Sequence, residues 1–78
     1  MKGLLFKIDK NGERLSNNVN VYVTYYSNVI YVESKELQHL EIKKGDLLYY
    51  SDDDIDINST YEVESCVSKT QISVRKIR

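Results

Sequence analysis

The amino-acid sequence predicts a mainly β domain, either an open β-rich sheet or a small six-stranded β-barrel, with one short helix at about residues 35–40. Val, Ile, Tyr, Thr and Phe supply 26 of the 78 residues, and these β-branched and aromatic side chains favour strands. Alanine, the best helix former, is absent, and so is proline, which commonly protects strand edges. Exposed edges therefore require charge, closure or a partner chain. A chain of this length holds a single core, so residues 1–78 form one domain.

The first predicted strand covers Lys2–Asp9. It ends in the turn Asp9-Lys10-Asn11-Gly12, because Asn and Gly tolerate positive φ angles. A second polar break follows at Ser16-Asn17-Asn18, and it separates this strand from the next apolar segment.

Residues 19–32 carry the clearest strand pattern of the chain. Val19, Val21, Val23 and Tyr25 alternate with other side chains, which is the period of a strand with one buried face. After a short connection at 27–28, the strand pattern continues from 29 to 32. Because residues 15–32 carry no charge, we expect this segment to be buried on both faces or to lie at an interface.

A short helix is predicted over Lys35–Leu40, with Ser34 as its capping residue. Leu37 and Leu40 are three positions apart, so they lie on the same face of this helix. Ile42 is expected to follow them into the core. The helix therefore covers part of the sheet.

Three further strands complete the predicted order. Leu47–Tyr50 forms one of them, and Tyr61–Val67 pairs with Gln71–Ile77 as a terminal hairpin. The expected order is thus three strands, the short helix, and three strands.

The segment Asp52–Asn58 is predicted to be a solvated acidic loop. Its alternating carboxylates are similar to the start of a calcium-binding loop. However, Ile57 occupies the sixth position, where such loops need glycine, and Val63 occupies the twelfth, where they need glutamate. No metal and no cofactor are therefore expected.

The net charge of −1 is unevenly distributed. Residues 1–14 carry +2, residues 33–64 carry −7 and residues 65–78 carry +4. A total near zero gives little reason to expect strong non-specific binding to nucleic acid. The two basic ends would share a face if the first and last strands were neighbours.

No combination of side chains predicts an enzyme. His39 is the single histidine and has no nucleophile nearby in the sequence. Cys66 is the single cysteine, expected to be a packed, inert thiol, and the two cannot form a tetrahedral zinc site within one chain. One unpaired cysteine, no signal peptide and no long apolar run predict a cytoplasmic protein without a membrane partner.

The segment VIYVESKELQHLEIKKGDLLYY, residues 29–50, resembles the AbrB/MazE-type swapped-hairpin domain. In that family a strand leads into a "PKEL…LGIKxGD" stretch and then another strand. Ser34 stands in place of the proline, and Glu41 in place of the glycine that ends the helix. The matching positions are Lys35, Glu36, Leu37, Leu40, Ile42, Lys44, Gly45 and Asp46. The resemblance implies a homodimer with interlocked β-hairpins, which binds operator DNA as a transcription regulator or antitoxin.

Under this interpretation, basic and amide side chains contact the phosphates of duplex DNA. The basic residues are Lys7, Lys10, Arg14, Lys35, Lys43 and Lys44, and the amides that assist them are Asn11 and Asn17.

A second interpretation makes the chain an acidic inhibitor of phage or mobile-element origin, which blocks a nucleic-acid-handling enzyme. Carboxylates would face a basic protein partner, and tyrosines would anchor the contact. The carboxylates are Glu33, Glu36, Asp52, Asp53, Asp54 and Asp56, and the anchors are Tyr49, Tyr50 and Tyr61. A third interpretation is a structural subunit whose tyrosine-rich edge pairs with copies of itself.

Overall fold

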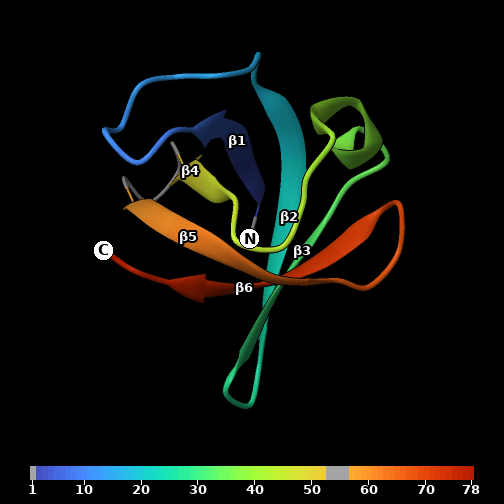
Figure 1. The fold of residues 1–78 in the computed structure, drawn as a ribbon. Coiled ribbons are helices and arrows are strands. Elements are labelled where there is room, and N and C mark those ends of the chain that lie inside the picture. Colours follow the sequence, from blue (N-terminus) through green and yellow to red (C-terminus); the bar gives the residue numbers. More distant parts are fainter. Residues whose placement is uncertain (1, 53–56) are drawn as a thin grey trace.

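Six antiparallel strands close into a barrel in the computed structural model, which describes residues 2–52 and 57–78 (Figure 1). The order around the barrel is β1-β2-β3-β6-β5-β4. The strands are β1 (Lys2–Ile8), β2 (Val19–Tyr26), β3 (Val29–Glu33), β4 (Leu47–Asp52), β5 (Ile57–Cys66) and β6 (Gln71–Lys76). The prediction of a small six-stranded β-barrel is confirmed.

Two pairings between strands that are not consecutive in the sequence close the barrel. β1 pairs with β4, which places Leu5 opposite Tyr50, and β3 pairs with β6, which places Val32 opposite Ile72. Each of these strands therefore has a hydrogen-bonded neighbour on both sides. Closure removes the exposed edges that a chain without proline would otherwise have to protect.

Apolar side chains on the inner faces of the strands form the core. The three valines of β2 are all buried, as their alternation predicts. Leu37 and Leu40 belong to the same core, and Ile42 packs against it, so their predicted positions are confirmed. The other members are Leu5, Val32, Leu48, Tyr50, Tyr61, Val63, Ile72 and Val74.

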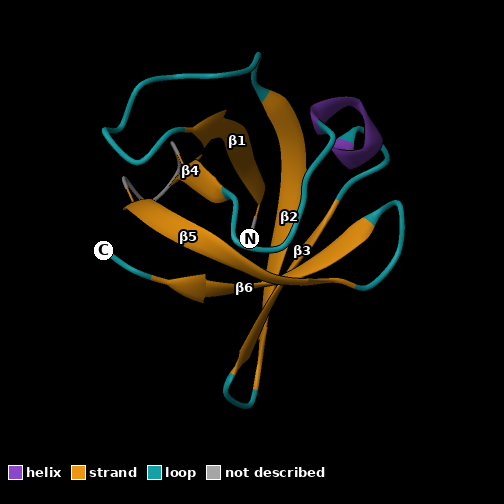
Figure 2. Ribbon diagram, in the orientation of Figure 1, coloured by secondary structure: helices purple, strands orange, loops and turns teal. Residues whose placement is uncertain are grey.

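The predicted short helix is a single 3-10 turn, η1 (Leu37–Leu40), which is the purple element in Figure 2. The N-cap of η1 is Glu36, without a side-chain cap hydrogen bond, so the prediction of Ser34 as the cap is wrong. Ser34 Oγ instead accepts the backbone N–H of Glu36 at 3.0 Å, in the turn before η1. Glu41 follows η1 with φ 51° and ψ 51°, a left-handed conformation. A left-handed residue ends a helix, so the element finishes at Leu40 as predicted, but it begins at Leu37 and not at Lys35.

The uncharged segment is buried on one face only in this chain, which corrects the expectation of two buried faces and leaves the interface alternative as a prediction. On the outer face of β2, Tyr22 is 58 % and Tyr26 is 72 % exposed. Tyr25 lies on the same face as the valines, yet it is 52 % exposed, so its predicted burial is wrong. The reason is its position near the end of a β2–β3 hairpin that extends from the barrel (Figure 1), where Ser27 turns the chain at φ 58°.

The bounds of the acidic loop predicted over 52–58 are corrected at both ends, because strands include its first and last residues. Asp52 is the last residue of β4 and only 4 % exposed, because β4 continues past its predicted end at Tyr50. Asn58 already belongs to β5. The predicted sites Asp53, Asp54 and Asp56 lie outside the described residues.

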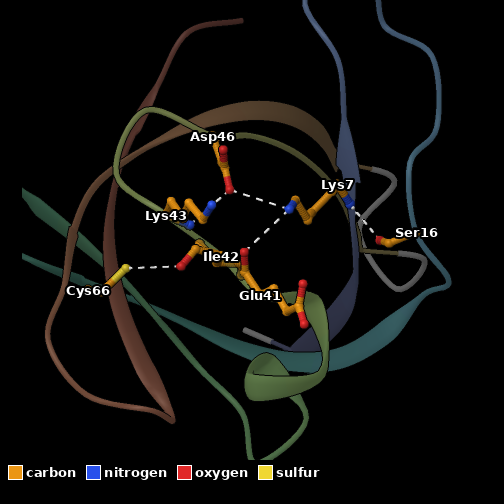
Figure 3. Close-up of polar contacts among 7 residues, drawn as sticks. All are labelled: Lys7, Ser16, Glu41, Ile42, Lys43, Asp46 and Cys66. Atoms are coloured by element: carbon orange, nitrogen blue, oxygen red, sulfur yellow. Dashed lines mark hydrogen bonds and ion pairs between the residues drawn. The ribbon is translucent and has the colours of Figure 1, made fainter.

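Cys66 is exposed at the end of β5, so the predicted packed thiol is wrong. A bulge between Val63 and Ser65 shifts the register of β5 against β6, and beyond it the strand runs to the rim of the barrel. The Cys66 thiol donates to the carbonyl oxygen of Ile42 at 3.5 Å (Figure 3).

Candidate nucleic-acid interface

The antiparallel order of the barrel places three connections at the same end. Neighbouring strands run in opposite directions, so the connections after β1, β3 and β5 all emerge on one side. They comprise residues 9–18, 34–46 and 67–70, and together they are called the loop end below. The loop end carries every predicted phosphate-contacting residue except Lys7, namely Lys10, Asn11, Arg14, Asn17, Lys35, Lys43 and Lys44.

Five exposed lysines lie on the loop end. They are Lys10, Lys35, Lys43, Lys44 and Lys69. Within residues 2–52 and 57–78, none of these ammonium groups forms an ion pair. They therefore face solvent and are accessible to an anionic ligand.

Three carboxylates of the loop end point at backbone amides. Asp9 Oδ1 accepts two N–H groups of its own turn, at 2.8 and 2.9 Å. Glu36 Oε2 accepts an N–H group at the start of β2 at 2.9 Å, and Asp46 Oδ2 accepts that of Lys43 at 2.8 Å. Because each carboxylate is held against N–H dipoles, these acids order the connections and part of their charge is offset locally.

Arg14 is fixed in position on the first connection. Its guanidinium lies 4.4 Å from the centroid of the Phe6 ring. Its Nε donates to the carbonyl of Ser16 at 2.8 Å, and its Nη2 donates to Asn18 Oδ1 at 2.7 Å. A guanidinium has five N–H donors, so the remaining ones can bind a phosphate without much further ordering of the side chain.

Lys7 differs from the other predicted phosphate contacts because it is turned toward the interior of the loop end (Figure 3). Its Nζ lies 3.4 Å from the carbonyl oxygen of Glu41 and 3.5 Å from Asp46 Oδ2. Its backbone N–H donates to Ser16 Oγ at 2.9 Å. Lys7 thus links β1 to two of the three connections, and its ammonium is already engaged.

The three tyrosines that the acidic-inhibitor interpretation uses as anchors do not form an exposed surface. Tyr50 and Tyr61 are 0 % exposed and stack with ring centroids 5.8 Å apart, while Tyr49 alone is partly exposed. Burial, with the carboxylate of Asp52 as a smaller cause, raises the pKa of Tyr50 to about 12. Burial also raises the pKa of Tyr61, whose hydroxyl lies 3.4 Å from that of Tyr25. Tyr50 and Tyr61 are core residues, which corrects their predicted role.

The acidic residues of the same interpretation do not form one surface either. Glu36 lies on the loop end, and Glu33 is the last residue of β3 directly before it. Asp52 lies at the opposite end of the barrel and is buried. Strand direction separates these groups although they lie close together in the sequence.

The two basic ends of the chain are not brought together by adjacent strands. β1 and β6 are three strands apart in either direction around the barrel, so the first and last strands are not neighbours. Instead, Lys69 on the third connection lies at the same end of the barrel as the basic side chains of the first two connections. Sequence reasoning missed Lys69, although alternate connections of an antiparallel chain necessarily emerge at the same end.

Neither metal ligands nor membrane spans are found in the part of the chain that the structure describes. No three His, Cys, Asp or Glu side chains there are placed to hold a metal ion, and His39 is exposed on η1. No helix there has the length and apolar character to cross a bilayer. No protein-family model matches the sequence, and no curated protein or solved structure proves similar to it.

Proposed function

We propose that this chain is a small non-enzymatic protein that binds duplex DNA through its loop end, as a transcription regulator or antitoxin. The observation that supports the proposal is the gathering of Lys10, Arg14, Lys35, Lys43 and Lys44 on two connections at one end of the barrel. The AbrB/MazE resemblance of residues 29–50 points to the same function. It also implies a homodimer, which would bring two loop ends to one duplex. The single cysteine, Cys66, favours a reducing cytoplasm as the setting.

Phosphate contacts dominate the affinity of proteins for DNA, because each neutralised phosphate releases a condensed counterion. The five basic side chains are exposed, and three of the five carboxylates on the loop end, those of Asp9, Glu36 and Asp46, are held against backbone amides. Five such contacts predict a slope of about −4 to −5 when the logarithm of the binding constant is plotted against that of the salt concentration.

Fluorescence anisotropy of a labelled mixed-sequence duplex, titrated at low and at physiological salt, tests the proposal. We expect micromolar binding at low salt that weakens steeply as salt is added. The double variant Lys10→Ala/Arg14→Ala should bind at least tenfold more weakly. Its matched control is Lys76→Ala/Arg78→Ala, which removes the same two charge types at the opposite end of the barrel and should bind like the parent. Equal affinity of the two double variants would reject the loop end as the interface.

Sedimentation velocity on the same preparations tests the homodimer separately. A single species of twice the 9.1 kDa chain mass is expected at the concentrations that bind DNA. A monomer that still binds with the expected slope would remove the homodimer and leave the interface in place.

A further inference from the structure

A groove on the outer wall of the barrel opens beside the loop end. It has a volume of about 470 Å³, which is in the size range of small-ligand sites. Its lining includes an aromatic ring, two lysines, a carboxylate, an amide and a hydroxyl. These belong to Tyr22, Lys2, Lys35, Glu33, Asn20 and Thr70.

Tyr22 supplies an accessible aromatic face in this groove. It points outward from β2 and is 58 % exposed. Lys2 is its cross-strand neighbour, and the ammonium of Lys2 lies 5.9 Å from the ring centroid. The ammonium of Lys2 thus lies over one face of the ring, and a base would stack on the other face.

Lys35 supplies a second positive charge to the groove. It is the second residue after β3, and it lines the groove and also belongs to the loop end. Among residues 2–52 and 57–78, neither Lys2 nor Lys35 has a carboxylate within ion-pair distance. An anion bound at either position would therefore pair with an ammonium group that no described carboxylate neutralises.

Glu33 and Asn20 decide what can occupy the middle of the groove. Glu33 Oε1 accepts a hydrogen bond from Gln71 Nε2 at 3.2 Å, which leaves its second oxygen as an acceptor. A phosphate beside this carboxylate would be repelled, whereas the N–H edge of a nucleobase could donate to it. The side-chain amide of Asn20 adds both a donor and an acceptor.

We infer that this groove binds an unpaired nucleobase, stacked on Tyr22, with the flanking phosphates of a single strand at Lys2 and Lys35. A base inside a duplex is stacked on both faces and paired along its edge, so it cannot enter. Aromatic stacking combined with lysines along the backbone is the general way in which proteins hold single strands. The inference rests on the proposed function in one respect, since Lys35 would serve both ligands.

The test uses labelled (dT)8 and the labelled duplex side by side, with the full chain. Loss of stacking in Tyr22→Ala should weaken (dT)8 binding by about five- to a hundredfold. Tyr22→Phe keeps the ring and should bind (dT)8 like the parent. Tyr26→Ala is the matched control, because Tyr26 projects from the same face of β2 and is 72 % exposed but lies outside the groove lining. Tyr22 is exposed, so far-UV circular dichroism of all three variants should match that of the parent.

Three results would overturn the inference: no binding of (dT)8 by the parent, equal losses in Tyr22→Ala and Tyr26→Ala, or a loss in Tyr22→Phe as large as in Tyr22→Ala. Measuring the affinity for the duplex in the same variants distinguishes failure of the groove inference from failure of the proposed duplex-binding function. Tyr22→Ala should leave duplex binding unchanged, and Lys10→Ala/Arg14→Ala should leave the Tyr22 dependence of (dT)8 binding intact. Binding of (dT)8 with no duplex binding would retain the groove and reject the duplex interface.

Discussion

The Nζ atom of Lys7 lies 3.5 Å from Asp46 Oδ2. This ion pair connects the inner face of β1 to the turn that directly precedes β4. The same ammonium contacts the carbonyl oxygen of Glu41 at 3.4 Å. Asp46 in turn accepts the backbone N–H of Lys43. A lysine that sequence reasoning assigns to a phosphate is thus the cation around which the second connection is ordered.

We therefore predict that Lys7→Gln affects stability more than DNA binding. The free energy of unfolding should fall by about 0.5–1.5 kcal/mol, since the ion pair is only partly exposed and one hydrogen bond is lost with it. Duplex affinity should stay within about twofold, because no phosphate contact is removed. Urea unfolding and anisotropy on the same variant measure both quantities.

Lys10→Gln is the matched comparison for Lys7→Gln. Lys10 is exposed and forms no ion pair with a described residue, so its loss should leave stability within about 0.5 kcal/mol and weaken duplex binding severalfold. If Lys7→Gln instead weakened DNA binding as much as Lys10→Gln at unchanged stability, Lys7 would be a phosphate contact after all.

A second prediction concerns the end of η1. Glu41 adopts φ 51°, a conformation that costs an L-residue about 1 kcal/mol and glycine almost nothing. Glu41→Gly should raise the free energy of unfolding by about 0.5–1 kcal/mol, even after allowance for the greater freedom of glycine in the unfolded chain. Its interaction with Lys7 uses the backbone carbonyl, so it survives the substitution.

Glu41→Ala separates the backbone effect from loss of the side chain. Alanine has no access to the left-handed region at low cost, so this variant should show none of the gain measured for Glu41→Gly by urea unfolding. Equal stability of the two variants would mean that the left-handed conformation stores no strain.

A third prediction follows from the stacked tyrosines of the core. Burial raises the pKa of Tyr50 to about 12 and also raises that of Tyr61, above the ordinary value of 10.0. Between pH 10 and 12 the unfolded chain therefore loses tyrosine protons that the folded chain keeps. Stability should be independent of these groups below about pH 10 and fall as the pH rises toward 12.

Urea unfolding at pH 8, 10 and 11 measures this alkaline loss. The double variant Tyr50→Phe/Tyr61→Phe has no phenol at either position, so its unfolding free energy should decline less over the same range. An equally steep decline in parent and double variant would assign the alkaline instability to other groups.

The inner face of β2 could be predicted because its valines alternate with polar or amphipathic residues. The same rule could not orient β4, where all four residues of Leu47–Tyr50 are apolar or aromatic. The pairing with β1 decides the outcome, because it places Tyr50 opposite the buried Leu5. The pairing of β4 with β5 likewise places Tyr61 opposite the buried Leu48. The sequence alone assigns Tyr50 and Tyr61 to a surface, whereas register places both in the core.

The loop end could be predicted only in part. The residue types and the connections that carry them follow from turn signals such as Asp9-Lys10-Asn11-Gly12. The inward orientation of Lys7 does not, because it depends on closure of the barrel between β1 and β4. The groove beside Tyr22 also needs the three-dimensional arrangement, since its lining comes from β1, β2, β3 and two connections.

A fourth prediction concerns two glycines that are needed for different reasons. A Cβ at Gly3 would collide with the carbonyl oxygen of Ser51 and lie 2.6 Å from Cε1 of Tyr50, so β1 approaches β4 too closely for a side chain. Gly12 has open space around it but adopts φ 86°, which L-residues avoid. Gly3→Ala should therefore cost about 1–3 kcal/mol of unfolding free energy, and Gly12→Ala about 1 kcal/mol.

Asparagine at each position distinguishes the two causes by urea unfolding. At position 12 it should be less destabilising than alanine, because asparagine tolerates positive φ. At position 3 it should be more destabilising than alanine, because the larger side chain meets the backbone of Ser51 and the ring of Tyr50. The same rank order of Ala and Asn at both positions would contradict this division, since one requirement would then explain both glycines.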